Sequence, residues 1–513
     1  MVKYSIEKIA TLIGARRIGD ADAQIGWLLT DSRSLCFPEE TLFFALSSAR
    51  NDGHKYISDL YRRGVRNFVV KNNSQFSSLN SQFSDANFLV VPSPLAALQR
   101  LAERHRDEFD IPIVGITGSN GKTMVKEWLY QILLPSQKIV RSPKSYNSQI
   151  GVPLSVWLLN EQTEIGIFEA GISQPGEMMA LRDIIQPTVG VFTSLGSAHQ
   201  ENFRSMEEKC MEKLELMHDT QALIYCSDND IVSRCIRRMQ YKGEKIAWSQ
   251  CDEQVAFFVK AIDGTKISYR YKGEDNAFEI PFSDEASIED CITCAATALY
   301  LGVTPQQLAE RMPTLEPVAM RLEVKEGQRG CILVNDSYNS DINSLDIALD
   351  FLNRRLRENN SQFSTLNSQL SKTLILSDMY QTGVVPELLY AQVSDLCVKR
   401  GIEKFIGIGP DLSAQADKIQ IADKQFFLDV QHFLASDVFS SLRGELILLK
   451  GARRFGFDQI TEQLEQKVAA VIGDAFYPND KTDRSMRVNY SCMPDDKIVE
   501  GVKRMAKAIK ECM

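Results

Sequence analysis

The most constraining feature of this chain is a glycine-rich turn at residues 115–123, with the sequence Gly-Ile-Thr-Gly-Ser-Asn-Gly-Lys-Thr. It follows the apolar run Ile111–Val114 and precedes the helix-like stretch Met124–Leu134. This order predicts a strand, a tight turn and the start of a helix. A helix start presents unpaired backbone N–H groups and the positive end of the helix dipole, which favour a phosphate. The sequence therefore predicts a phosphate-binding loop.

Two side chains at the end of this loop suit a nucleotide. Lys122 supplies a positive charge for the β- and γ-phosphates, and Thr123 offers a hydroxyl to Mg²⁺. The strict pattern of such loops has a glycine where this chain has Ile116. An ordinary glycine-rich turn between a strand and a helix therefore stays open as the alternative at this point.

Composition narrows the class of protein. The chain has 513 residues, 44% hydrophobic and 24% charged, which is typical of a globular protein with about three or four domains. Its net charge of −9 argues against a nucleic-acid-binding protein, because such proteins draw affinity from cationic contacts to phosphate. The eleven cysteines include one C-x-x-C, Cys291 to Cys294, inside a predicted helix, where chance explains it better than a metal or redox site.

Targeting signals are not evident in the sequence. Residues 1–14 include Glu7 and resemble an amphipathic helix rather than a signal peptide. No stretch approaches 18 consecutive apolar residues, so we expect no membrane span. These features predict an intracellular, cytoplasmic protein with reduced thiols.

Two polar residues follow predicted strands downstream of the loop. Glu169 ends a predicted buried strand within residues 164–171, and His199 follows the apolar run Val189–Thr193. The carboxyl ends of parallel strands form the edge of a sheet where ligands bind, so both residues are candidate metal ligands. For either residue alone, a surface carboxylate or a capping histidine would be the simpler explanation.

A further α/β unit begins near residue 320. Its predicted strands alternate with helices, as in βαβ units with a parallel sheet. The strands are Ile332–Val334, Thr373–Leu376, Lys404–Ile408 and Glu445–Leu449.

Two polar windows of 13 residues, 72–84 and 359–371, differ at only two positions. They lie nearly 290 residues apart in otherwise different surroundings, which excludes a solenoid repeat. We interpret both as insertions in surface loops, which loops tolerate at a modest entropic cost.

Several motifs, taken together and in this order, resemble the Mur ligase family. Each motif is loose by itself, whereas their joint order is specific. They are Thr30–Arg33, Thr117–Thr123, Tyr146–Pro153, Glu169–Gly171, Ala198-His199, Lys213–Glu215, Met320–Glu323 and Asn335–Asn339.

The resemblance implies an α/β protein with the three-domain Mur ligase architecture. Residues 1–108 would form a UDP-sugar-binding domain, residues 109–319 a central ATP-binding domain, and residues 320–467 a Rossmann-like domain for the incoming amine. Residues 468–513 instead resemble the last segment of a PLP-dependent class I/II aminotransferase. With no PLP-lysine domain before it, we interpret this tail as a scar of fusion or truncation and assign Arg487 no catalysis.

The resemblance also implies roles for individual residues, with ATP and Mg²⁺ as cofactors. Lys122, Lys213 and His199 would be catalytic; Thr123, Glu169, His199 and a carbamylated Lys213 would hold Mg²⁺. Contacts to ATP would come from Gly118, Ser119, Asn120, Gly121, Lys122, Thr123, Asp290, Arg321 and Asp336. Asp31, Ser32, Arg33 and Asn147 would contact the sugar nucleotide.

Within the family, Asp336–Asn339 favours the member that adds D-alanyl-D-alanine to UDP-N-acetylmuramoyl-tripeptide through an acyl phosphate. We expect the chain to act as a monomer and, from its net charge, to bind no nucleic acid. A member that adds a single amino acid, or a catalytically impaired nucleotide-binding relative, is the alternative. The chain departs from the usual motifs at Ser148, Ser194, Glu289-Asp290 and Ser340–Ile342.

Overall fold

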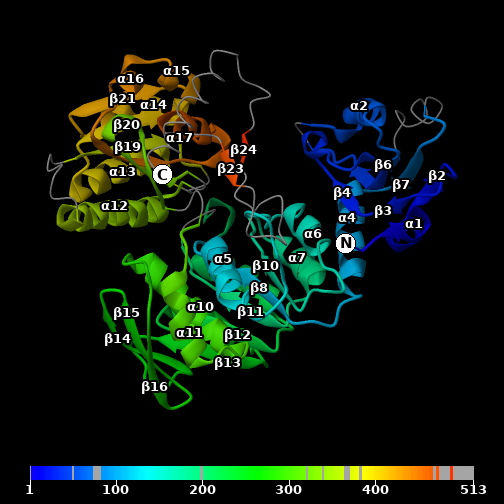
Figure 1. The fold of residues 1–513 in the computed structure, drawn as a ribbon, viewed down its shortest axis with the longest axis horizontal. Helices are drawn as coiled ribbons and strands as arrows, with labels where there is room; N and C mark the ends of the chain where they lie inside the picture. The colour runs from blue at the N-terminus through cyan, green and yellow to red at the C-terminus, as the bar shows by residue number, and fades with distance from the viewer. Residues whose placement is uncertain are drawn as a thin grey trace. The chain divides into compact units, whose positions relative to one another are not determined.

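The structure is a computed structural model of the 513-residue chain. It describes residues 2–48, 51–72, 83–196, 200–318, 322–337, 340–362, 370–380, 384–465, 470–472 and 486–488. The chain divides into two compact units, and Figure 1 shows their elements. One unit contains residues 1–318 with 341–355 and 379–389, and the other contains residues 319–340, 356–378 and 390–513.

The N-terminal part is built on a five-stranded sheet in the order β2-β7-β6-β5-β4. Its strands are parallel except β2, and a further pair, β1 and β3, is antiparallel. The strands are β1 (Tyr4–Ser5), β2 (Arg16–Ile18), β3 (Gln24–Ile25), β4 (Trp27–Leu29), β5 (Thr41–Phe44), β6 (Asn67–Lys71) and β7 (Asn87–Val91). The helices are α1 (Ile6–Ile13), α2 (Ile57–Arg62) and α4 (Pro94–Arg106).

Helices α1 and α4 cover one face of this sheet because their apolar stripes match its buried side chains. Ser5 and Ser93 start these helices by accepting hydrogen bonds from backbone N–H groups of the first turn. Helix α4 precedes the first strand of the next sheet. Its buried His105 bonds to Tyr4 through Nδ1 and to the carbonyl of Leu159 through Nε2, at 2.9 and 3.1 Å.

A nine-stranded sheet in the order β16-β15-β14-β13-β12-β11-β8-β10-β9 follows. The seven strands from β9 to β14 are parallel, and β15 and β16 continue as antiparallel strands. Their bounds are β8 (Ile113–Thr117), β9 (Ile139–Arg141), β10 (Ile165–Glu169), β11 (Val189–Phe192), β12 (Ala222–Cys226), β13 (Glu244–Ser249), β14 (Phe257–Asp263), β15 (Lys266–Tyr271) and β16 (Glu274–Glu279).

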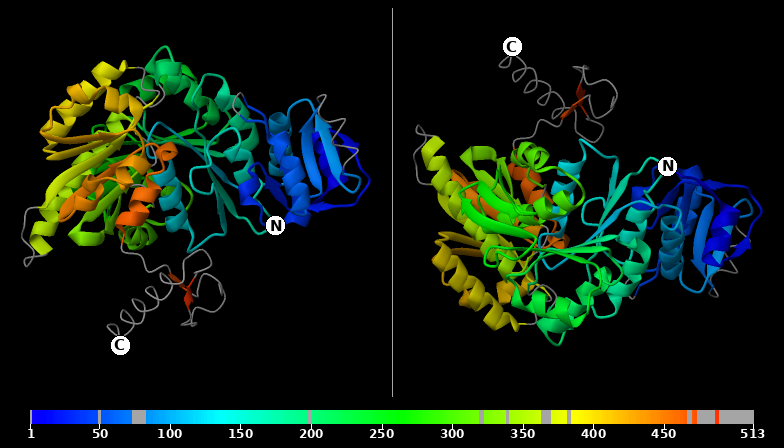
Figure 2. Two further views of the ribbon diagram at one scale, coloured as in Figure 1. Left: turned by 90° about the horizontal axis from the view of Figure 1, so that it is seen from above. Right: turned by 90° about the horizontal axis from the view of Figure 1, so that it is seen from below.

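Two helical layers enclose this sheet, as Figures 1 and 2 show. One layer contains α5 (Lys122–Leu133), α10 (Glu285–Tyr300) and α11 (Pro305–Arg311). The other contains α6 (Gly151–Val156), α7 (Glu177–Ile185), α8 (Met206–Leu214) and α9 (Asp230–Arg238). Because both faces are covered, the parallel strands carry nearly continuous apolar side chains, and β8 is buried along its whole length.

The third sheet has six strands in the order β17-β18-β22-β19-β20-β21, all parallel except β17. Its strands are β17 (Glu323–Glu326), β18 (Ile332–Asp336), β19 (Ser371–Ser377), β20 (Lys404–Ile408), β21 (Asp423–Phe427) and β22 (Glu445–Lys450). The helices of this region are α12 (Ile342–Gln362), α13 (Pro386–Arg400), α14 (Pro410–Ala414), α15 (Val430–Leu434), α16 (Asp437–Ser441) and α17 (Asp458–Leu464). The expected α/β class, with its βαβ pattern after residue 320, is confirmed.

Some local expectations need correction. Helix α12 extends to Gln362, so the first four residues of the window at 359–371 are helical rather than part of a loop. Strand β21 has only half-buried and exposed side chains and was not predicted. Most of both polar windows, and the helix expected near the C-terminus, lie outside the described residues. In the tail, β23 (Ala470–Ile472) pairs with β24 (Met486–Val488) as a separate two-stranded sheet.

Among the described residues, no helix is long and apolar enough to span a membrane.

Candidate active site

The glycine-rich turn lies where the sequence predicts, between β8 and α5. Strand β8 is flanked by β10 and β11, so the loop emerges at the carboxyl ends of three neighbouring parallel strands. Gly118 and Gly121 have φ values of 147° and 80°. A Cβ atom at Gly118 would lie 2.1 Å from Thr193 Oγ1, and one at Gly121 would lie 2.2 Å from Asp290 Oδ1. Both positions therefore need glycine for backbone conformation and for space.

The residues after β11 hold this loop in place. The N–H of Ser119 donates to the carbonyl of Ser194 at 2.7 Å, and the N–H of Asn120 reaches the Ser194 hydroxyl at 3.2 Å. The Ser119 hydroxyl donates to the carbonyl of Gly196 at 3.1 Å. Ser194 thus fixes two loop residues, a role that sequence reasoning missed. The signal available was a serine directly after a buried strand.

Lysine side chains gather around the loop. Lys122 donates to the carbonyls of Gly118 and Ser119 at 2.7 and 2.8 Å, and Lys213 of α8 donates to the carbonyl of Gly118 at 3.0 Å. The pKa of Lys213 lies well below its ordinary value because the group is fully buried, and because Lys122 and Lys209 add positive charge nearby. The ammonium of Lys122 creates a positive potential suited to a polyphosphate.

Lys209 is a second buried lysine of α8 that the sequence did not single out. It lies one helical turn before Lys213 and donates to the carbonyl of Gly196. Burial lowers the pKa of Lys209 to about 8. Two lysines four residues apart on one helix lie on the same face, which is the pattern that could have revealed the pair.

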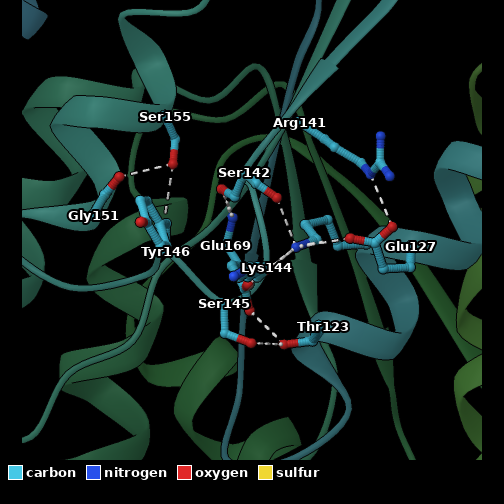
Figure 3. Close-up of polar contacts among 11 residues, drawn as sticks. Thr123, Glu127, Arg141, Ser142, Lys144, Ser145, Tyr146, Gly151, Ser155 and Glu169 are labelled. Atoms are coloured by element: carbon cyan, nitrogen blue, oxygen red, sulfur yellow. Dashed lines mark hydrogen bonds and ion pairs between the residues drawn. The ribbon is translucent and has the colours of Figure 1, made fainter. Parts of the chain in front are cut away.

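Glu169 and Thr123 form an oxygen-rich corner beside the loop (Figure 3). Glu169 ends β10 and is fully buried, and its Oε2 accepts a hydrogen bond from the Thr123 hydroxyl at 3.0 Å. The Ser145 hydroxyl lies 2.9 Å from Thr123 Oγ1. A carboxylate and hydroxyl oxygens are the hard ligands that Mg²⁺ prefers, so these residues fit that ion. Within the described residues, no cluster of three or more His, Cys, Asp and Glu forms a candidate metal site.

Asp290 belongs to α10 and approaches the loop through Gly121. The sequence predicts a helix over Ser287–Leu301 with Asp290 in its first turn. The helix instead begins at Glu285 with Asp284 as its N-cap, so Asp290 lies in the second turn. A pocket of about 280 Å³ lies beyond β11 and β12, and Ser194, Asp228 and Glu289 are among its lining residues. Burial, together with the charges of Glu285 and Asp228, raises the pKa of Glu289.

Asn147 lies beside the end of β10. Its carbonyl accepts a hydrogen bond from the N–H of Gly171 at 2.8 Å. Its side chain is close enough that a Cβ at Gly171 would lie 3.0 Å from Asn147 Cγ. Asn147 and Glu169 therefore belong to the same edge of the sheet.

Asp31, Ser32 and Arg33 form a short turn after β4. Asp31 accepts from the backbone N–H of Arg33 and pairs with its guanidinium at 2.6–3.1 Å. Hydrogen bonding to Arg33 lowers the pKa of Asp31. The Arg33 side chain is 87% exposed, and Arg63 donates to the carbonyl of Ser32 at 2.7 Å. This turn belongs to the N-terminal sheet rather than to the phosphate-loop cluster.

The remaining predicted residues fall in two groups. Asp336 ends β18 in the second unit, where it is buried and pairs with Lys450 Nζ at 2.7 Å. His199 and Arg321 lie outside the described residues. The roles assigned to all three stay predictions.

Comparisons with known proteins identify a matching family model and similar chains. Residues 116–298 match the Mur ligase middle domain. The chain is 25% identical over 481 residues to the UDP-N-acetylmuramoyl-tripeptide–D-alanyl-D-alanine ligase of Bacillus subtilis, with 90% of this chain and 99% of the relative covered.

Two solved structures are similar in fold. A crystal structure of MurF from Acinetobacter baumannii has a TM-score of 0.72 and 18% identity, covering 91% of this chain and 100% of that one. The MurF ligase from Thermotoga maritima, in complex with ADP, has a TM-score of 0.65 and 21% identity, covering 85% of this chain and 96% of that one.

Proposed function

We propose that this chain, which belongs to the Mur ligase family, uses ATP to join D-alanyl-D-alanine to UDP-N-acetylmuramoyl-tripeptide in peptidoglycan precursor synthesis. The likeness to dipeptide-adding ligases over nine-tenths of the chain supports this substrate pair. The observation that carries the proposal is the loop at 118–123, with Lys122, Lys213 and the Thr123–Glu169 corner around it.

The chemistry of amide formation explains why this arrangement is suitable. A carboxylate is a poor electrophile, so it needs a leaving group before an amine can attack it. Transfer of the γ-phosphoryl group of ATP to the carboxylate of the tripeptide gives an acyl phosphate and ADP. The free amine of the dipeptide then attacks the acyl carbon, and the tetrahedral intermediate expels phosphate as the amide bond forms.

Positioning and charge neutralisation are the main requirements of phosphoryl transfer. The N–H groups at the start of α5 and the ammonium of Lys122 would hold the phosphates. Thr123 and Glu169 would hold Mg²⁺, which neutralises phosphate charge when it is bound. In this arrangement the loop binds and orients the nucleotide before any bond changes.

Lys213 fits a different role from Lys122. Carbamylation requires a neutral amine, and burial beside two other lysines lowers the pKa of Lys213 in the direction that favours this form. A carbamate is anionic and offers oxygen ligands, so a carbamylated Lys213 would join His199 in holding a second Mg²⁺.

The substrates would contact other parts of the chain. Asp31, Ser32 and Arg33 would bind the uridine end of the sugar nucleotide, and Asn147 would lie along it. Asp290, Arg321 and Asp336 would contribute to nucleotide binding. Action as a monomer in the cytoplasm belongs to the same proposal.

Phosphate release from ATP tests this function directly. The purified protein is given UDP-N-acetylmuramoyl-tripeptide with D-alanyl-D-alanine, or with single amino acids, and inorganic phosphate is measured. We expect release that depends on both the sugar nucleotide and the dipeptide. Release with a single amino acid instead would assign the chain to another member of the family. No release with any acceptor would refute the proposal.

A further inference from the structure

A buried lysine beside the phosphate loop has no role in the proposed reaction so far. Lys126 lies one helical turn after Lys122 on α5, and its side chain is 0% exposed. Four oxygen atoms surround its Nζ, and Figure 3 shows the four residues that supply them. They are the carbonyls of Ser142 (2.8 Å) and Lys144, and the carboxylates of Glu127 (3.1 Å) and Glu169 (3.3 Å).

A buried cation is stable only when charge and hydrogen bonds compensate for lost water. An ammonium group has three N–H donors, so the four oxygen partners engage all of them. Glu169 Oε1 faces Lys126, while Glu169 Oε2 faces Thr123. Lys126 therefore fixes the rotation of the carboxylate that we assign to the metal corner.

The two carbonyl partners belong to the turn at residues 142–147, which connects β9 to α6. Lys144 has a φ of 50°, a left-handed conformation that is unfavourable for a residue with a Cβ atom. Such a conformation persists only where neighbouring contacts enforce it. The bonds from Lys126 to the carbonyls of Ser142 and Lys144 are contacts of this kind.

This turn also carries side chains into the site. The Ser145 hydroxyl lies 2.9 Å from Thr123 Oγ1, and Asn147 bonds to the N–H of Gly171 just after β10. One ammonium group thus connects the helix of the phosphate loop, the end of β10, and the segment that carries Asn147.

We propose that Lys126 is a positioning residue that fastens Glu169 and the turn at 142–147 to α5, and so couples the nucleotide loop to the sugar-nucleotide site. The inference rests on the proposed function for the assignment of Asn147 to the sugar nucleotide. Lys126 itself touches no substrate, because its oxygen partners enclose it.

The test replaces Lys126 by methionine, which keeps an unbranched side chain only one atom shorter and removes the charge and the donors. We expect the Kd of UDP-N-acetylmuramoyl-tripeptide, measured by calorimetry without nucleotide or Mg²⁺, to rise about tenfold. The KM for this substrate should rise similarly, and the KM for D-alanyl-D-alanine should stay within about twofold. Lys138→Met, at an exposed lysine before β9, is the matched control and should bind as the unchanged protein does.

A second substitution separates positioning from simple damage. Glycine adopts the left-handed conformation freely, so Lys144→Gly removes the strain that Lys126 offsets. The double variant Lys126→Met/Lys144→Gly should therefore recover at least threefold of the lost affinity. If it recovers none, the turn is not what Lys126 holds, and the inference is wrong.

If Lys126→Met does not fold, Lys126→Gln decides the question: it removes the charge and one of the three donors, and it places the remaining N–H₂ group on a shorter side chain. Unchanged binding of the sugar nucleotide by a folded variant, with methionine or glutamine at this position, overturns the inference. Absence of binding by the unchanged protein would instead overturn the proposed function, so the two failures are distinguishable.

Discussion

The phosphate loop and the turn at Asp31–Arg33 are both predicted to bind substrate, yet they are organised in opposite ways. Around the loop, Lys126, Lys213 and Glu169 are buried and bonded to groups from several elements. At the turn, Arg33 is almost fully exposed and pairs with Asp31, two residues away. The first region is held by buried contacts between distant parts of the chain, and the second mainly by exposed contacts within the turn, with one bond from Arg63 to the carbonyl of Ser32.

This difference indicates which region is prepared for chemistry. Groups that stabilise a transition state act best when they need no rearrangement, and burial strengthens their electrostatic interactions. Exposed charges are screened by water and salt, so they contribute more to recognition than to rate. We therefore expect substitutions at the loop to change kcat and substitutions at the turn to change KM.

The largest effect should come from Lys122→Ala or Glu169→Ala. Each removes charge that stabilises the transferred phosphoryl group or the metal, so we expect phosphate release to fall at least a thousandfold, on the order of 4 kcal/mol. Glu164→Ala changes an exposed glutamate just before β10 and is the matched control, with a near-normal rate expected. A near-normal rate in either loop variant would remove the distinction between the two regions.

The sequence predicted the loop well because its signals are local. Glycines at positions that need positive φ, and a lysine and threonine at the start of a helix, are readable without a structure. Glu169 was also predictable, since a carboxylate that ends an apolar strand is conspicuous. Lys126 was not, because its partners at Ser142 and Lys144 come from a turn whose position depends on the packed fold.

The fold was predictable to a similar extent. Alternating strands and helices indicated the parallel sheets, whereas β21, which lacks buried side chains, gave no apolar signal. The exact start of α10 was also missed, because Asp284 acts as a cap only through its bond to the N–H of Ser287. The periodicity of the sequence therefore left strand β21 and the start of α10 undetermined, and packing and capping contacts determine them.

We expect burial, rather than the part of the chain in which a group lies, to determine how an ionisable group affects stability. His105 of the N-terminal part tests this. Burial lowers the pKa of His105 to about 4, whereas an unfolded histidine has a pKa near 6.5. Between these values the unfolded chain binds the extra proton, so the stability conferred by neutral His105 is complete above pH 6.5 and is lost as pH falls toward 4. The total loss is about 3 kcal/mol.

The measurement compares urea unfolding of the unchanged protein and of His105→Gln between pH 8 and pH 4. Glutamine does not titrate, so the advantage of the unchanged protein should shrink by about 3 kcal/mol as pH falls. Parallel pH profiles would show that His105 does not enter the fold as the neutral form. They would also mean that burial does not act on ionisable groups in the N-terminal part as it does on the lysines around the loop.

A smaller effect is expected at the exposed turn. Arg33→Ala should raise the KM for UDP-N-acetylmuramoyl-tripeptide about tenfold with little change in kcat, because a contact to the substrate is lost. The melting temperature should change little, because the Arg33–Asp31 pair that is lost with it is exposed. Arg62→Ala, at a neighbouring arginine that pairs with Asp59 on the surface, is the control. A large fall in kcat would mean that the turn takes part in organising the chemistry.

The smallest effect should follow removal of residues 468–513. The Bacillus subtilis relative is covered over 99% of its length by 90% of this chain, so its match does not require the whole chain. Strands β23 and β24 pair only with each other among the described strands, and they do not extend the six-stranded sheet. Because a lone two-stranded pair adds little stability, kcat/KM should stay within about twofold of the full chain. A shortened protein that remains folded but loses phosphate release would show that the tail contributes to the site. The comparison between the phosphate loop and the turn at Asp31–Arg33 would then have to include the tail.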